Sequence, residues 1–201
     1  MESMKKVGIT GSIGAGKSFV GSLLRDRGFR VLDADVAVHD LYRENATLRG
    51  ELAENFGEEC LTPSGVNRDY FIRKIFSDDG ARTRLESIVY PHLTRYVKDF
   101  LDAPVHDGEN TQGIRFVEAA LLSRAPGIVG MLDEIWIVDA PEDMRLERLV
   151  NRGMERSDAL RRIENQRGEC IAERFAGKTV HTLENAGLRG ALESRLDALL
   201  R

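Results

Sequence analysis

The 201-residue sequence contains little cysteine and lacks a long apolar run. Its two cysteines, Cys60 and Cys170, are far apart, and neither forms a CxxC pair or has histidines at metal-ligand spacing. This pattern excludes a disulfide framework and a cysteine-based zinc site, so we interpret both residues as reduced thiols. Because no apolar run approaches the length of a membrane-spanning helix, we expect no membrane segment.

The sequence also has no excess of basic residues. Lysine and arginine together number 29 against 33 acidic residues, a net charge of -4 that argues against a nucleic-acid partner. Neither a GxSxG hydrolase motif nor a guanine-reading NKxD element occurs, which disfavours a serine hydrolase and a GTPase switch. The start Met1–Lys6 leads directly into apolar sequence and leaves no room for a cleavable signal, so we expect a cytoplasmic protein.

The most informative segment is GSIGAGKS, from Gly11 to Ser18, which matches the phosphate-binding pattern GxxxxGK[ST] and is called the phosphate loop below. Its glycines let backbone amides approach phosphates, Lys17 supplies charge at the terminal phosphates, and the Ser18 hydroxyl can reach Mg²⁺. The pattern predicts a nucleotide site formed by Ser12, Ile13, Gly14, Ala15, Gly16, Lys17, Ser18 and Phe19.

The flanking sequence supplies the context that this loop requires. The short stretch KKVGIT before it reads as a strand, and the apolar residues after it recur at helical spacing until Gly28, which is expected to close the helix in a left-handed conformation. The apolar face of this helix is predicted to comprise Phe19, Val20, Leu23 and Leu24.

Alternation of strands and helices continues along the chain and predicts an α/β fold with a parallel sheet flanked by helices. Residues 36–103 show helical periodicity with no convincing strand, residues 104–112 read as a connecting loop, and the charged run after Pro141 is helical. We expect a nucleotide-binding core of 1–35, 112–140 and 177–201, a helical insertion at 36–111 and a helical lid at 141–176.

Two acidic positions are candidates for chemistry. Asp33 and Asp35 follow the second strand, where one carboxylate could act as a general base and the other could cap the next helix; we favour Asp33 as the base and Asp35 as the cap. Glu118 ends the strand IRFV, where an acid either helps to hold Mg²⁺ or caps the following helix, and the residues leave both readings open.

Arginines are concentrated late in the chain. Arg145, Arg148 and Arg152 share one helix face, and they belong to a larger group between residues 145 and 174. Such a group is either a solvated face of paired charges or a lid whose arginines close over phosphates. In the insertion, Arg68 and the corner Tyr90, Pro91, His92 are the polar features to examine, with a hydrogen-bonded structural role expected for an isolated histidine.

The layout is typical of a nucleotide or metabolite kinase, and specific segments resemble the dephospho-CoA kinase family over nearly the whole chain. These segments are GITGSIGAGKSFV, GFRVLDADVAVHDL, GVNRDYFIRKIFSDDGARTRLESIVYPHL, VEAALL, VDAPEDMRLERLVNR, Gln166 in RIENQ and LENAG. The resemblance implies a P-loop kinase fold with a five-stranded parallel sheet, and ATP-dependent phosphorylation of the ribose 3'-hydroxyl of dephospho-CoA with Mg²⁺.

Carried over from the family, the loop from Gly14 to Phe19 binds ATP, Asp33 is the base, and Arg148 is the lid arginine. Substrate contacts are expected from Asp33, Arg68, Tyr90, His92 and Glu118, and metal contacts from Ser18 and Glu118. The chain departs from the family pattern chiefly in the acceptor half and the lid: Tyr90 replaces a usual histidine, Ser123 falls within AALLSR where PLLFE is usual, and GKT at Gly177 replaces an AD pair. Another small-molecule kinase and a nucleotide-binding regulatory protein are the alternatives.

Overall fold

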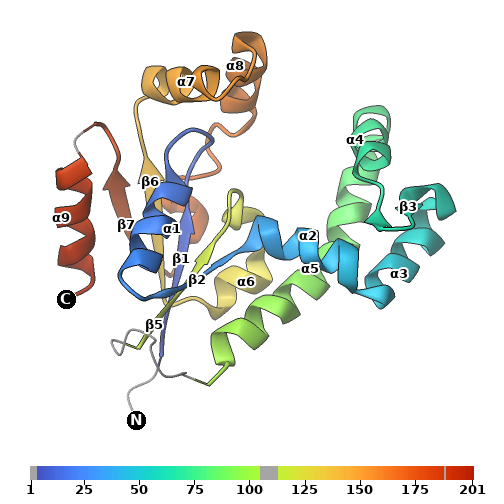
Figure 1. Ribbon diagram of the computed structural model, residues 1–201, viewed down its shortest axis with the longest axis horizontal. Coiled ribbons are helices and arrows are strands. Elements are labelled where there is room, and N and C mark those ends of the chain that lie inside the picture. Colours follow the sequence, from blue (N-terminus) through green and yellow to red (C-terminus); the bar gives the residue numbers. More distant parts are fainter. Residues whose placement is uncertain (1–3, 105–112, 188) are drawn as a thin grey trace. The chain divides into compact units, whose positions relative to one another are not determined.

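The computed structural model describes residues 4–104, 113–187 and 189–201 (Figure 1). The chain divides into two compact units, of which the first comprises residues 1–32 and 103–201 and the second residues 33–102. Most of the predicted connecting loop, residues 105–112, lies outside the described residues. The functional division into core, insertion and lid stays a prediction.

Five strands of the first unit form one sheet in the order β2-β5-β1-β6-β7 (Figure 1). The pairings of β1 with β5, β1 with β6, and β6 with β7 are parallel, as the sequence predicted. β1 is central, and its last four residues are buried because both faces of the sheet are covered. The strands are β1 Lys5–Thr10, β2 Arg30–Asp33, β5 Ile114–Glu118, β6 Glu134–Asp139 and β7 Thr179–Glu184.

Helices α1 and α9 contribute to the same apolar cluster as the inner strands. Val20, Leu23 and Leu24 of α1 are buried as predicted, but Phe19 is 36% exposed, because it lies at the first turn beside the open loop. Gly28 closes α1 with φ 83°, which confirms the predicted left-handed position. The helices of this unit are α1 Lys17–Asp26, α6 Pro126–Met131, α7 Glu142–Asn151, α8 Arg156–Asn165 and α9 Arg189–Leu199, with 3-10 turns η2 Leu122–Arg124 and η3 Ala172–Phe175.

The second unit is helical, as predicted, with one exception. A short antiparallel hairpin pairs β3 with β4, although the sequence predicted no strand in this region. Each strand has two residues, too few to show an alternating pattern in the sequence. The elements are α2 Ala34–Glu44, α3 Ala46–Phe56, η1 Glu58–Cys60, β3 Leu61–Thr62, β4 Gly65–Val66, α4 Arg68–Ser77 and α5 Asp79–Asp102.

Asparagine side chains start two helices of the second unit. Asn45 accepts a hydrogen bond from the backbone N–H of Leu48, and Asn67 accepts one from Tyr70, so each satisfies a donor that the first helical turn leaves open. Over the residues described, no helix is long and apolar enough to cross a membrane.

Candidate active site

The phosphate loop connects the central strand β1 to helix α1. Gly14 and Gly16 adopt φ 80° and φ 99°, a region that side chains with a Cβ rarely occupy, so both glycines are needed for this curve. No side chain of the described residues caps the amino end of α1. Its first N–H groups and the positive end of the helix dipole therefore remain available to an anion.

A cavity of about 240 Å³ lies over this loop. Every predicted nucleotide-binding residue lines it except Ala15, which is fully buried. Gly11, Ala120, Arg152 and Gln166 complete the lining. Of these, the sequence had given a possible role only to Arg152, as one of the arginines of a possible lid. The cavity therefore combines the helix amino end, the Lys17 side chain and an arginine around one space, which is the chemistry that phosphate groups require.

Lys17 and Glu118 form an ion pair inside the first unit. Lys17 Nζ donates to Glu118 Oε1 at 3.0 Å, and Arg25 Nη2 lies 3.6 Å from Glu118 Oε2. The Glu118 side chain is fully buried. Gly21 makes room for it, because a Cβ at that position would lie 2.5 Å from Oε2. Glu118 is thus a counter-ion of Lys17 and caps no helix, which excludes the capping alternative.

Arg148, predicted as the lid arginine, is bonded to backbone carbonyls. Its Nη1 donates to Gly14 O and Ala15 O, both at 3.3 Å, and its Nη2 donates to Asn185 O at 2.8 Å. Asn185 in turn donates from Nδ2 to Ala15 O at 2.8 Å. The back of the phosphate loop is therefore fixed by two side chains, one from α7 and one from the end of β7.

The tip of the loop, at Ile13, is held by Gln166, the residue that follows α8. Gln166 Oε1 accepts a hydrogen bond from the Ile13 N–H at 2.8 Å. The Ile13 side chain packs against a small apolar cluster of α7 and α8, formed by Leu146, Leu149, Ala159 and Ile163. The sequence comparison with the family included Gln166 and Asn185 but gave them no role, because nothing in the local pattern shows which distant backbone group they meet.

A second polar cluster joins η2 to the turn that follows α8. Arg124 donates from Nη2 and Nε to Glu169 Oε1 at 2.6 and 3.0 Å, and Ser123 Oγ donates to Glu169 Oε2 at 2.9 Å. The Arg124 hydrogen bonds, aided by Ser123, hold the pKa of the Glu169 carboxyl below its usual value. Ser123 and Arg124, which lie in the segment AALLSR that departs from the family pattern, therefore share a partner, Glu169, in this chain.

We expect Glu169→Gln to lower the free energy of unfolding by about 1–2 kcal/mol at neutral pH, because charge-assisted hydrogen bonds are lost. The folded-state pKa is depressed, so the carboxylate stabilises fully above its ordinary pKa of 4.5 and progressively less as the pH falls through the folded value. Denaturant titrations of parent and variant between neutral and acidic pH test this. A difference that stays constant down to low pH would contradict the assignment.

Cys170 lies beside the start of the loop. Its Sγ is 3.8 Å from Thr10 Oγ1 and donates to Ala120 O at 3.7 Å. Burial raises the pKa of the Cys170 thiol, which keeps it protonated and weakly nucleophilic. The interpretation of this cysteine as a reduced structural thiol fits these contacts.

Asp33 ends β2 and also begins helix α2. Its Oδ1 accepts from Asp35 N at 2.9 Å and from Val36 N at 3.2 Å. The predicted assignment of Asp35 as the cap was wrong, because α2 begins at Ala34 and the capping position falls on Asp33. The other carboxylate oxygen of Asp33, Oδ2, forms no hydrogen bond within the described part of the chain, so capping leaves it available for chemistry.

Four of the predicted substrate contacts, Asp33, Arg68, Tyr90 and His92, belong to the second unit, whereas Glu118 belongs to the first. Burial raises the pKa of Tyr42 to about 12, opposed by the charge of Arg68 and reinforced by Tyr90. The three side chains are therefore electrostatic neighbours, and Tyr42 is a member that the sequence did not single out. His92 lies 3.0 Å from Glu51 Oε2 through Nε2 and 3.3 Å from Asn45 Nδ2 through Nδ1. These contacts agree with a structural histidine, and its substrate role stays a prediction.

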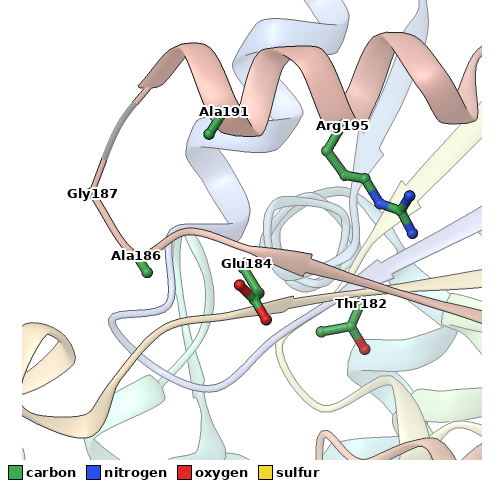
Figure 2. A pocket seen from close by; sticks show the side chains of 6 residues that line it. All are labelled: Thr182, Glu184, Ala186, Gly187, Ala191 and Arg195. Carbon is green, nitrogen blue, oxygen red and sulfur yellow. The ribbon is translucent and has the colours of Figure 1, made fainter.

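A larger cavity, of about 530 Å³, lies at the outer edge of β7 (Figure 2). Thr182 and Glu184 project from β7, and Arg195 extends from α9 toward the strand. The remaining lining residues are Ala186, Gly187 and Ala191. No phosphate-loop residue lines this cavity. We therefore assign no phosphate chemistry to it, although it is larger than the cavity over the loop.

A phosphate loop between β1 and α1 of a parallel sheet in this order defines a P-loop kinase fold. Shikimate kinase from Bacteroides thetaiotaomicron shares the fold, with TM-score 0.54 and 14% identity over 98% of this chain and 99% of its own. Within that class, the family model for dephospho-CoA kinase matches residues 5–187. The chain belongs to the dephospho-CoA kinase family, which confirms the resemblance seen in the sequence.

Two relatives are similar over nearly the full length of this chain. A dephospho-CoA kinase from Anaeromyxobacter dehalogenans is 33% identical over 199 residues, 98% of this chain and 91% of the relative. The crystal structure of TT1252 from Thermus thermophilus superposes with TM-score 0.78 at 34% identity and covers 99% of this chain and 97% of its own.

Proposed function

We infer that this chain transfers a phosphoryl group from ATP to the ribose 3'-hydroxyl of dephospho-CoA and releases coenzyme A and ADP. Membership of the dephospho-CoA kinase family over residues 5–187 carries this conclusion. The intact phosphate loop supports it, because the amino end of α1, Lys17 and the cavity above them form a donor site for a nucleotide.

Lys17 has a defined protein partner in this structure. Its ammonium group is neutralised by Glu118, whose carboxylate is also near Arg25. The negatively charged β and γ phosphates of ATP can replace Glu118 as the partner of Lys17, while the loop N–H groups bind the phosphate oxygens. In this proposal Glu118 orients the Lys17 ammonium group through their 3.0 Å hydrogen bond until the substrate arrives.

The residues present fit a magnesium ion held largely through ATP. The donors near the loop are oxygens, the Ser18 hydroxyl and the Glu118 carboxylate, which suit a hard cation. Among the described residues, buried Glu118 Oε2 has no hydrogen-bond partner, so it is the oxygen that could accept from a metal-bound water. Among the residues described, no cluster of three His, Cys, Asp or Glu side chains forms a protein-only cage. When bound, Mg²⁺ neutralises phosphate charge.

Asp33 is proposed as the general base, and the arginines of α7 as the source of the lid's positive charge. The carboxylate of Asp33 is oriented by its cap hydrogen bonds, which fix Oδ1 and leave the other oxygen to accept the proton of a ribose hydroxyl. Arg68, Tyr90 and His92 are proposed to bind the acceptor. These assignments rest on the motifs of the family and on the local contacts of each residue.

The function is tested by acceptor-dependent ADP formation. We expect the purified protein with ATP and Mg²⁺ to release ADP rapidly with dephospho-CoA, and only slowly with nucleoside monophosphates, shikimate or gluconate. Release with another acceptor would identify a different kinase. ATP binding without acceptor-dependent ADP formation would instead support a regulatory nucleotide-binding protein.

A further inference from the structure

Two arginines near the end of α7 have different surroundings, although they stand one turn apart. Arg148 is partly buried, and its hydrogen bonds to Gly14 O, Ala15 O and Asn185 O use both terminal nitrogens. If this guanidinium moved to a phosphate, the three carbonyl groups would lose their hydrogen-bond donor. The back of the loop would then lose its attachment to α7. The contacts of Arg148 are those of a residue that holds the loop.

Arg152 lies at the carboxyl end of α7 and is exposed. Arg152 lines the cavity above the loop together with Lys17 and Ser18. Across residues 4–104, 113–187 and 189–201, its guanidinium forms no hydrogen bond or ion pair. Within that part of the chain it is therefore a cation at the phosphate cavity without a protein anion to neutralise it.

Other arginines of the lid are directed elsewhere. Arg145 lies 3.8 Å from Glu142, and Arg167 lies 3.3 Å from Glu142 and 2.9 Å from Glu164. Both line a neighbouring cavity of about 410 Å³ that is bordered by Asp139 and Glu173 and does not contain Lys17. Paired with carboxylates, they have less capacity to bind a phosphate than Arg152 has.

We propose that Arg152 is the lid arginine that contacts the transferring phosphoryl group, and that Arg148 is a positioning residue that holds the phosphate loop. This inference rests on the proposed kinase function and divides the role that the sequence assigned to Arg148 alone. Charge that develops on the phosphoryl oxygens is stabilised by a preorganised cation in the same space. Arg148 affects ATP indirectly, because it holds the loop in shape. Its substitution should therefore weaken ATP binding.

The test compares Arg152→Gln and Arg148→Gln with a control, Arg161→Gln. Arg161 is an exposed arginine of α8 whose partner is Asp158, away from the cavity lining. We expect Arg152→Gln to lower kcat by about 10²-fold or more, with the Kd for ATP changed by less than about threefold. Arg148→Gln should instead weaken ATP binding by about tenfold or more and lower Tm, with a smaller effect on kcat. The control, Arg161→Gln, should match the parent in kcat, in the Kd for ATP and in Tm.

Chemical rescue separates the two roles further. Guanidinium ion added to Arg152→Ala should restore part of kcat, because the missing group belongs in a solvent-accessible cavity, and it should not restore Arg148→Ala. The proposal is overturned if Arg152→Gln keeps kcat within about threefold of the parent, or if Arg148→Gln loses kcat with unchanged ATP affinity and Tm. Arg148→Lys serves if the glutamine variant does not fold.

Failure of the underlying function gives a different result. If the parent does not phosphorylate dephospho-CoA, the proposed function is wrong, and the acceptor that it does use replaces dephospho-CoA in the same comparison. If the parent uses no acceptor, the kcat assignment of Arg152 is also wrong, whereas the effect of Arg148 on ATP binding is still measured directly by calorimetry.

Discussion

Replacing Asp33 with asparagine is expected to lower kcat by roughly 10²–10⁴-fold, the usual contribution of a general base, with little change in stability. Asparagine caps helices about as well as aspartate, and its side-chain oxygen can still accept from Asp35 N and Val36 N. The substitution therefore removes the proton acceptor and keeps the start of α2. A substitution that also destroyed the cap would lower stability, and a loss of rate could then not be attributed to the missing base.

The measurement is kcat under saturating ATP and dephospho-CoA, with ATP affinity and Tm determined in parallel. Asp35→Asn is the matched control, since it removes an exposed carboxylate two residues away that does not cap α2. Turnover by Asp33→Asn at the parent rate would remove Asp33 as the base. An equal loss of rate in both variants would point to the charge of the segment rather than to one carboxylate.

Replacing Lys17 with methionine is expected to lower turnover by at least roughly 10²–10³-fold, because the cation for the terminal phosphates is lost. The same change should lower the free energy of unfolding by about 3 kcal/mol, since breaking a buried pair leaves a charge without its partner. Glu118 is fully buried, Lys17 is only 13% exposed, and Arg25 remains at 3.6 Å as partial compensation.

A double variant distinguishes the two effects of Lys17. Lys17→Met with Glu118→Gln removes both charges, so Tm should recover most of the loss while turnover stays low. Lys98→Met, in an exposed pair with Asp102 on α5, is the control and should change Tm little. A double variant as unstable as Lys17→Met would show that the lost stability does not come from the buried Glu118 charge.

Features that arise within a short stretch of chain could be predicted from the sequence. The phosphate loop, its flanking strand and helix, Gly28 and the parallel sheet follow from spacing and from residue type. The position of Glu118 at the carboxyl end of β5 also followed, because parallel strands bring their ends to one edge of the sheet.

Features that depend on where two distant segments meet could not be predicted. Arg148 reaches the loop from 134 positions along the chain, and Gln166 reaches Ile13 across 153. Helix periodicity showed that Arg148 and Arg152 share a face. It could not show that Arg148 contacts backbone carbonyls or that Arg152 lines an open cavity. The choice between Asp33 and Asp35 as the cap failed for a local reason, since it depends on the single residue at which α2 begins.

The aromatic residues divide between the two units in a way that gives each its own optical signal. The only tryptophan of the chain, Trp136, is buried in β6 with its ring 5.2 Å from that of Phe116. All four tyrosines, Tyr42, Tyr70, Tyr90 and Tyr96, lie in the second unit. Selective excitation of tryptophan therefore follows unfolding of the first unit, and tyrosine absorbance follows the second, helical unit. Without any label, coincident or separate transitions would show whether the two units unfold together.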